Sequence, residues 1–401
     1  DYHKGLVRLK NKYHFTDLSE FNFEWIVEAN GKAIGSGVLE NVSLSPQQDE
    51  LFQTSFPAIN GEQGVEYFLN LYALAKNDKG LIKAGTRLAK EQIELPFGKK
   101  AIMESNKQSD YRVIEDGNFV FAQGAGYKIG WDKESGKLCS YLVDGAECIL
   151  EPLRPNFWRP SIDNDLGSKL ATICTPWRNA GRDCKLILFD VSTEDGLTHV
   201  KTIYQLPFDD KVTFSINYKV LPKGELLVSC EFNPYSSNLP VIPRIGVTLA
   251  LKGQYDNVEW FGRGPFESYV DRYTSAFVGL YEGKVWDQYF AYDRPQENGN
   301  KLDVRWMNLT NNEGKGLQVK GMPHLSLSVY NFETDDLSEV DVKKHQRHMN
   351  DIVRKDMVTW NIDLKQMGLG GDTTWGAFPH EQYLVHPLKT SYEFILKPVK
   401  N

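Results

Sequence analysis

Hydrophobic and polar residues alternate along most of this chain with the period of two that marks half-buried β-strands. Phe21, Phe23 and Trp25 fall on one face of such a strand, with polar or charged residues between them. Much later in the chain, Phe214 and Ile216 alternate with polar residues in the same way. Segments with the helical period are few. The pattern therefore predicts an all-β protein.

The first 98 residues contain short strand-like runs that are separated by turn signals. Asn30-Gly31 follows the run at 21–28 and is a dipeptide typical of two-residue hairpin turns. Further strands are expected at 3–15, 38–44 and 65–74. Roughly seven short strands in about 95 residues are typical of an immunoglobulin-like β-sandwich, which we expect over residues 1–98.

Residues 99–110 are mostly polar and are expected to form a linker. From residue 111 to residue 401, short strands repeat without alternating helices. This pattern favours one large sandwich over a (β/α)8 barrel or a Rossmann unit. Thr334 is expected to cap one short helical turn.

Composition excludes two classes of partner. The chain has 401 residues, 41% of them hydrophobic, and a formal net charge of -7. It lacks the positive charge of a nucleic-acid-binding protein, and the negative charge argues against binding to anionic membranes. No apolar run approaches the roughly 20 residues that span a bilayer. We therefore expect neither nucleic acid nor a membrane as a partner.

The five cysteines indicate the state of the thiols, and the first residue indicates whether the sequence is part of a longer polypeptide. The cysteines show no C-x-x-C spacing, so unpaired thiols are expected rather than a disulfide framework or a zinc site. The sequence starts with Asp1 within a strand-like pattern, so we expect a piece of a longer polypeptide. Its compartment, bacterial cytoplasm or periplasm, stays open.

Two clusters mix charged residues with aromatic ones. Glu267, Asp271 and Arg272 follow a turn after a strand and lie among aromatic residues, and Arg294 and Glu297 form a second such cluster. Charges in aromatic surroundings indicate half-buried ion pairs rather than a solvated surface. We expect a structural network in which these residues are mostly buried and paired with one another.

These clusters belong to a larger set of motifs in this order along the chain: R-P-S-I-D-N-D-L-G at 159–167, W-F-G-R-G-P-F-E-S-Y-V-D-R at 260–272, R-P-Q-E-N-G at 294–299, R-W at 305–306 and Q-M-G-L-G-G-D-T-T-W-G at 366–376. The set closely resembles the C-terminal domain of the large bacterial β-galactosidases of glycoside hydrolase family 2. The resemblance covers the whole chain and is weaker before residue 110.

The resemblance implies a fold and a set of partners. Residues 1–98 would be the family's immunoglobulin-like spacer domain, and residues 111–401 its galactose-mutarotase-like β-supersandwich. Retaining glycosidases need two carboxyl groups about 5–5.5 Å apart. In this family both groups lie on a (β/α)8 barrel, which this sequence lacks. We therefore expect no catalytic residue in this chain.

The implied partners are the missing barrel and N-terminal domains, a galactoside in the intact enzyme, and a further copy of the chain in a homo-oligomer. No cofactor is expected in this segment, whereas metal ions could occupy the parent enzyme's barrel. Whether this chain holds a metal is open. Asp163–Gly167 begins like a calcium loop, but Cys174 stands where the bidentate Glu would be, so a simple turn is expected.

The loop at 368–376 is the candidate for substrate contact. Gly370 and Gly371 permit backbone conformations that other residues avoid, and Asp372 can support the loop by hydrogen bonding. The resemblance implies that Trp375 leaves the domain and stacks on sugar at the mouth of the active site, as an aglycone platform. The alternative is a core tryptophan that packs against Trp360 or Phe378.

Two other functions stay open at this point. A free-standing mutarotase-like epimerase would need a His and Glu pair facing a concave sheet, and His324 is one candidate. A sugar-binding module would need an aromatic-lined cleft that works alone.

Overall fold

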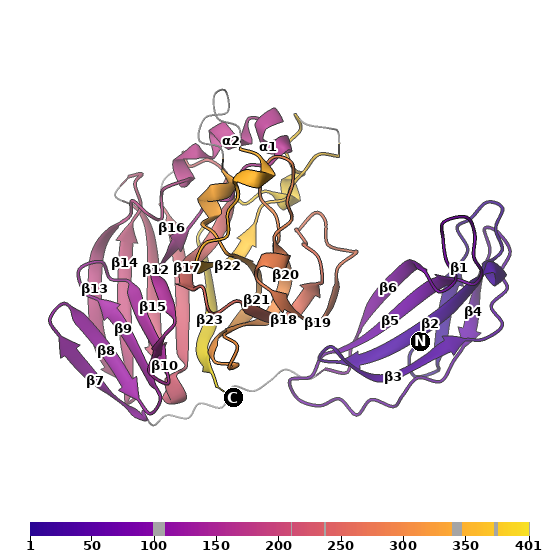
Figure 1. The fold of residues 1–401 in the computed structure, drawn as a ribbon, viewed down its shortest axis with the longest axis horizontal. Coiled ribbons are helices and arrows are strands. Elements are labelled where there is room, and N and C mark those ends of the chain that lie inside the picture. The colour runs from indigo at the N-terminus through magenta and orange to yellow at the C-terminus, as the bar shows by residue number, and fades with distance from the viewer. Residues whose placement is uncertain (99–108, 210, 236–237, 339–346, 373–375, 401) are drawn as a thin grey trace. The chain divides into compact units, whose positions relative to one another are not determined.

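The computed structural model describes residues 1–401 apart from 99–108, 210, 236–237, 339–346, 373–375 and 401. It divides into two compact units, Asp1–Glu104 (unit 1) and Ser105–Asn401 (unit 2). Strands dominate both units (Figure 1), which confirms the expected all-β class. The expected linker at 99–110 falls mostly outside the described residues.

Unit 1 is built from two antiparallel sheets. A four-stranded sheet has the order β3-β2-β5-β6, and a two-stranded sheet pairs β1 with β4. Trp25, Val27 and Leu69 are buried in its core. The strands are β1 (Leu6–Lys10), β2 (Phe21–Ala29), β3 (Lys32–Leu39), β4 (Asp49–Gln53), β5 (Tyr67–Ala75) and β6 (Arg87–Leu95).

The hairpin in unit 1 confirms one prediction and corrects another. Asn30 and Gly31 have φ values of 46° and 76°, as a tight two-residue turn requires. Because such a turn pairs its flanking residues at once, Ala29 lies opposite Lys32. The returning strand therefore runs from Lys32 to Leu39, and the expected strand at 38–44 is wrong.

Unit 2 contains a five-stranded sheet and a twelve-stranded sheet. The smaller sheet has the order β11-β10-β9-β8-β7, and the main path of the larger one is β12-β17-β22-β21-β23-β16-β15-β14-β13. The smaller sheet consists of β7 (Tyr111–Asp116), β8 (Phe119–Gly124), β9 (Tyr127–Asp132), β10 (Leu138–Val143) and β11 (Ala146–Glu147).

The larger sheet also carries β18, β19 and β20 off its main path. Its strands are β12 (Ile149–Asn156), β13 (Lys185–Glu194), β14 (Leu197–Gln205), β15 (Val212–Val220), β16 (Leu226–Pro234), β17 (Arg244–Lys252), β18 (Asn257–Gly264), β19 (Phe277–Lys284), β20 (Lys301–Thr310), β21 (Gly316–Tyr330), β22 (Met357–Gln366) and β23 (Thr390–Val399).

The two sheets of unit 2 share one aromatic-rich core. Trp131 on β9 packs edge-on against Tyr218 on β15, with 5.7 Å between ring centroids. Phe157 and Trp177 extend this core beyond the end of β12. The alternating apolar residues of β15 thus face the core, as the sequence pattern predicts, and a sandwich results.

Helices are short and lie between strands. The segment expected to be a simple turn forms α1 (Asp163–Gly167), and α2 (Leu170–Ile173) follows it. The Asp165 carboxylate accepts a hydrogen bond from the Ile162 backbone N–H, which satisfies a donor at the start of α1. A 3₁₀ turn at Thr334–Leu337 confirms the expected turn there, although Glu333 is its N-cap.

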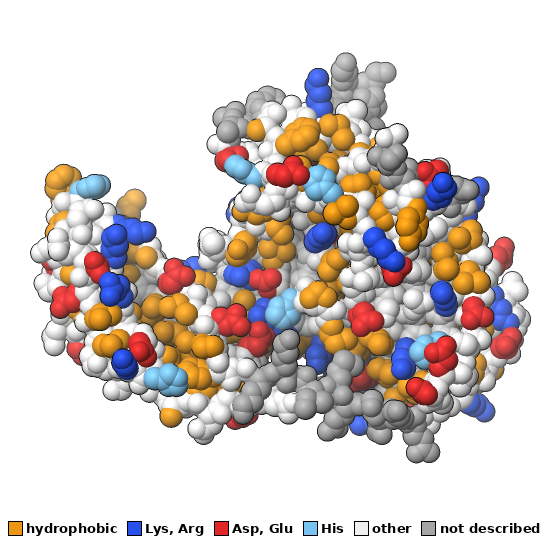
Figure 2. All heavy atoms as spheres, turned by 180° about the vertical axis from the view of Figure 1, so that it is seen from behind, with side chains coloured by type: hydrophobic (Ala, Val, Ile, Leu, Met, Phe, Trp, Pro, Cys, Tyr) orange, Lys and Arg blue, Asp and Glu red, His pale blue; other side chains and the backbone are white. Residues whose placement is uncertain are grey.

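The visible described surface mixes residue types. Figure 2 shows acidic, basic and apolar side chains interspersed over it. Within the described residues, no helix is long and apolar enough to cross a membrane. All five cysteines are free thiols, as the sequence predicts.

Candidate functional site

Four of the five motif segments, all but the R-W pair at 305–306, meet at one cleft of about 390 Å³ in unit 2, which we call the motif cleft. Its walls come from the α1 segment, the turn after β18, the segment before β20 and the loop after β22. The lining residues are Ile162, Asp163, Asn164, Asp271, Arg272, Tyr292, Gln296, Glu297, Leu369 and Gly370. Segments that lie far apart in the sequence therefore form one surface.

Arg159 ties the α1 segment to the loop after β22. Its Nη2 donates to both carboxylate oxygens of Asp165 at 2.8 Å. Its Nη1 donates to the carbonyl oxygens of Met367 and Gly368 at 3.1 Å each. Both charged side chains are buried, so on folding they replace hydrogen bonds to water with two hydrogen bonds to each other in a fixed geometry.

Two further side chains hold the loop after β22. Asn164 Nδ2 donates to the Leu369 carbonyl at 3.2 Å, and Asp271 Oδ2 accepts from the Gly370 N–H at 2.8 Å. Gly371 has a φ of 91°, and a Cβ built there would lie 2.3 Å from Asn164 Nδ2. Close approach and backbone conformation therefore both require glycine at this position.

Glu267 fixes one wall of the cleft. Its Oε1 forms an ion pair with Arg272 and accepts from the Tyr292 hydroxyl at 2.9 Å. Its Oε2 accepts from the Gly299 N–H at 2.8 Å. This single carboxylate thus joins the turn after β18 to the segment before β20.

Asp163 ties the α1 segment to the segment before β20. Its carboxylate forms an ion pair with Arg294 and accepts from Gln296 Nε2 at 3.1 Å. The Arg294 side chain is largely buried, whereas Asp163 is exposed. The resulting bond spans 131 positions of sequence.

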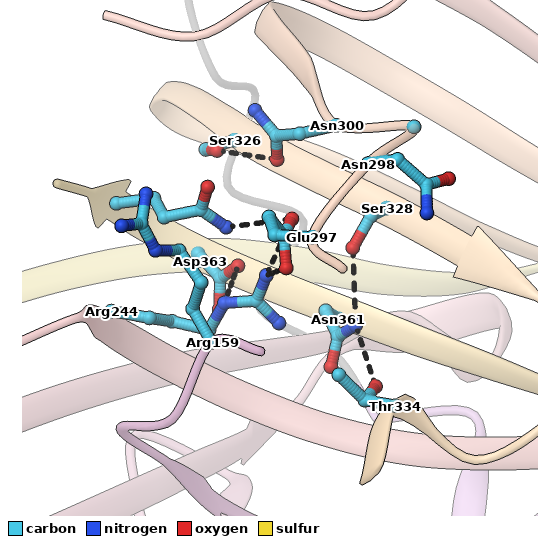
Figure 3. Close-up of polar contacts among 12 residues, drawn as sticks. Arg159, Arg244, Glu297, Asn298, Asn300, Ser326, Ser328, Thr334, Asn361 and Asp363 are labelled. Atoms are coloured by element: carbon cyan, nitrogen blue, oxygen red, sulfur yellow. Dashed lines mark hydrogen bonds and ion pairs between the residues drawn. The ribbon is translucent and has the colours of Figure 1, made fainter. Parts of the chain in front are cut away.

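Glu297 lies beneath the cleft with two other charged groups, all fully buried (Figure 3). Arg244 Nη2 donates to the Glu297 carboxylate at 3.2 and 3.3 Å. The carboxylate of Asp363 lies 3.1 Å from Arg244 Nε but accepts no hydrogen bond from the described residues. Tyr269 and Gln366 also donate to Glu297.

Burial dominates the electrostatics of this triad. Burial and, to a smaller extent, the charge of Glu297 raise the pKa of Asp363 to about 8, although Arg244 lowers it. Burial raises the pKa of Glu297 as well. One cation thus faces two acids in a medium that disfavours net charge, and one bound proton makes the triad neutral.

The expected network is therefore only partly right. Glu267 and Arg272 are paired, and Glu297 is buried. However, Glu297 pairs with Arg244, Arg294 pairs with Asp163, and the Arg272 side chain is 52% exposed. Glu297 and Arg294 each pair with a charged residue outside the expected set, which the fold brings from a distant part of the sequence.

Sequence reasoning missed the most buried members of the site. Arg244 and Asp363 stand in strands whose alternation gave no sign of a charged interior. Arg159 and Asp165 stand in a quoted motif, but their spacing alone did not predict a pair.

The predicted loop residues are only partly described. Asp372 Oδ2 lies 2.7 Å from His380 Nε2, and this bond lowers the pKa of Asp372. Trp375 lies outside the described residues. His324 is exposed on β21 and does not line the motif cleft.

The polar side chains of the cleft hold backbone segments in place. Its carboxylates already bond to guanidinium, hydroxyl or backbone N–H groups, and Glu297 is sealed from solvent. Among the residues that the structure describes, no three His, Cys, Asp or Glu side chains are grouped as metal ligands. The cleft positions backbone, above all that of the loop after β22.

The fold and the cleft define an all-β sandwich protein with a surface loop held by side chains from distant segments. The chain belongs to the family described as "Beta galactosidase small chain", whose sequence profile matches residues 123–396. Residues 7–96 match a second profile, "Beta-galactosidase, domain 4".

Curated relatives extend this result over the whole chain. A β-galactosidase from Priestia megaterium is 32% identical over 99% of this chain and 38% of its own length. One from Halalkalibacterium halodurans is 27% identical over 94% of this chain and 37% of its own length. The chain thus spans well under half of these relatives.

Among solved structures, a galactose 1-epimerase from Lactobacillus acidophilus matches 73% of this chain and 98% of its own. Its TM-score is 0.35 and its sequence identity is 14%, a similarity too distant to bear on function.

Proposed function

We propose that this chain is the C-terminal, non-catalytic part of a retaining β-galactosidase, which hydrolyses terminal β-D-galactosides. The observation that carries the proposal is the family match together with relatives of more than twice this length. The occupied carboxylates of the motif cleft support it, because a retaining mechanism needs two that are free to act on the substrate.

In this proposal the motif cleft positions the loop that contacts substrate. Arg159, Asn164 and Asp271 bond to four consecutive residues of the loop, 367–370. The Asp372–His380 bond follows a few residues later. A loop held at so many points restricts the orientations of the residues that follow, and Trp375 would stack on the sugar as a platform at the aglycone subsite.

The test is Trp375→Ala in the assembled enzyme, compared with Trp375→Phe. A stacking contact supports substrate binding more than chemistry, so the alanine variant should bind a disaccharide or a glucose acceptor about 1–3 kcal/mol more weakly. The phenylalanine variant should lose less. Loss of folding stability with unchanged substrate binding would show instead that Trp375 is a core residue.

A further inference from the structure

A second hollow in unit 2, the arginine cavity, shares no lining residue with the motif cleft. It has a volume of about 40 Å³ and lies against β12, β17 and β22. Three arginines line it, namely Arg154, Arg178 and Arg182. This inference is independent of the proposed function.

Two of these arginines have acidic partners within the cavity wall. Arg178 donates to Asp335 Oδ1 through Nε at 3.2 Å and Nη2 at 2.9 Å. Arg182 Nη2 lies 3.3 Å from Glu333 Oε2. Their charges are therefore compensated by the chain itself.

Arg154 differs from both. No hydrogen bond or ion pair joins its guanidinium to any residue that the structure describes, and its nitrogens stay accessible to solvent. Burial and the positive charge of Arg182 lower the pKa of Arg154, and the charges of Glu151 and Glu333, which are not close enough to form ion pairs with it, oppose them in part. A guanidinium offers five donors and stays charged at any physiological pH, so leaving it half-buried and unpaired is costly.

The strands behind Arg154 form a polar floor. In the sheet register, Arg154 on β12 lies opposite Thr248 on β17, which lies opposite Asn361 on β22. Asn361 is itself held by Ser328 and Thr334, at 3.0 and 3.2 Å (Figure 3). The floor is thus rigid and hydrogen-bonded, while the guanidinium above it is not.

The size of the cavity limits what could complete it. A water needs about 10–15 Å³, so the cavity holds about three groups of that size. That is the size of a carboxylate or of most of a phosphate group, and both match the planar fork of arginine. Glu151 also lines the cavity, but it is exposed and forms no ion pair with Arg154 in the described structure.

We propose that the arginine cavity binds a small oxyanion, the phosphate or carboxylate group of a ligand, through the guanidinium of Arg154. Asp335 and Glu333 already compensate Arg178 and Arg182, so Arg154 supplies the attraction for the anion, and Glu151 opposes it. The bound group would supply a hydrogen-bonded counter-charge, whereas Glu151 and Glu333 act on Arg154 only at longer range.

The test uses the 401-residue chain with inorganic phosphate and with acetate, at constant ionic strength set by chloride. Calorimetric titration should show saturable binding of at least one of the two anions, and that anion should raise the melting temperature. Preference for phosphate or for acetate then identifies the group. Saturable binding of neither would overturn the proposal.

Three variants sharpen the result. Arg154→Gln should weaken binding at least tenfold, whereas Arg112→Gln, at an exposed position on β7, should leave it unchanged. Glu151→Gln removes the opposing charge and should tighten binding several-fold. If Glu151 is instead the true partner of Arg154, then Glu151→Gln will destabilise the fold without tightening the anion.

Should Arg154→Gln fail to fold, Arg154→Lys keeps the charge but loses the fork and should still bind the anion more weakly. Equal binding by Arg154→Lys and the parent chain would contradict a role for the guanidinium.

Discussion

At the scale of single residues, Arg244, Glu297 and Asp363 form the most constrained group in the protein. All three side chains are fully buried, and they join β17, β22 and the segment before β20. Such a group adds little net stability while it is intact, because its desolvation offsets its attraction. Removal of one member is costly, because the buried groups that remain lose hydrogen bonds and part of their charge compensation.

Glu297→Ala should therefore lower the free energy of unfolding by about 3–5 kcal/mol, because Arg244 loses its hydrogen-bonded counter-charge. Chemical denaturation of the 401-residue chain measures this loss. Glu313→Ala is the control, since Glu313 is a largely exposed carboxylate whose ion pair with Lys315 lies at the surface. Equal stability of the two variants would show that the triad is not a structural network.

The raised pKa of Asp363 gives a second prediction. The folded state keeps a proton up to a pKa of about 8, whereas the unfolded chain releases it near the ordinary value of about 3.9. Between these values the unfolded state binds fewer protons, so stability should fall as pH rises, by at most about 1.4 kcal/mol per pH unit.

Asp363→Asn removes the titrating carboxyl group, so the unfolding free energy of the variant should depend less on pH. Between pH 5.5 and pH 7.5, the stability of the parent chain should fall by about 1–3 kcal/mol relative to the variant. Unfolding free energies at the two pH values test this. A constant difference between parent and variant would mean that Asp363 is ionised throughout the window.

Sequence reasoning reached part of this site. Aromatic neighbours marked Glu267 and Glu297 as half-buried, and the structure confirms that both have polar partners. It did not identify Arg244, because that partner lies 53 positions away on β17 and meets Glu297 through tertiary packing rather than through local pattern. Ion pairs between distant strands depend on register, which a single sequence does not specify.

At the scale of elements, the loop after β22 depends on glycine at position 371. Gly371→Ala would place a Cβ 2.3 Å from Asn164 and force φ of 91° on an alanine. Gly145→Ala is a matched control, because Gly145 has φ of 84° but nothing within 4 Å of the added Cβ. Both substitutions cost about 1 kcal/mol of stability because alanine avoids a positive φ, and only Gly371→Ala adds a steric clash to that cost.

We expect Gly371→Ala to be the more destabilising of the two in chemical denaturation. The double variant Gly371→Ala with Asn164→Ala removes the clashing side chain, so it should recover part of the difference. Equal losses for Gly371→Ala and Gly145→Ala would show that Asn164 does not constrain the loop.

Strand existence was predicted better than strand boundaries. Alternation identified β2 and β15 because their buried faces follow the pleat directly. The limits of β3 were missed because the turn at Asn30-Gly31, rather than hydrophobicity, decides where pairing restarts. The α1 segment was expected to be a turn, because Asp side chains support both turns and helix starts. In the structure, Asp165 accepts from the Ile162 N–H at the start of α1 and bonds to Arg159, a contact that the sequence did not predict.

At the scale of the whole molecule, the chain is two β-sandwich units that match neighbouring parts of β-galactosidases. In the proposed enzyme, this chain contributes a braced loop, and another part contributes the acid and the nucleophile. Since binding groups alone do not cleave a glycosidic bond, activity should require both parts.

The most direct measurement is hydrolysis of nitrophenyl β-galactoside by the pure 401-residue chain, by the catalytic part of the same enzyme, and by the two mixed. The account predicts no turnover by this chain alone, and high activity only in the mixture, where the two parts co-elute as a complex. Turnover by the pure chain that a substitution within residues 1–401 abolishes would contradict it, as would a mixture with neither complex nor gain in activity.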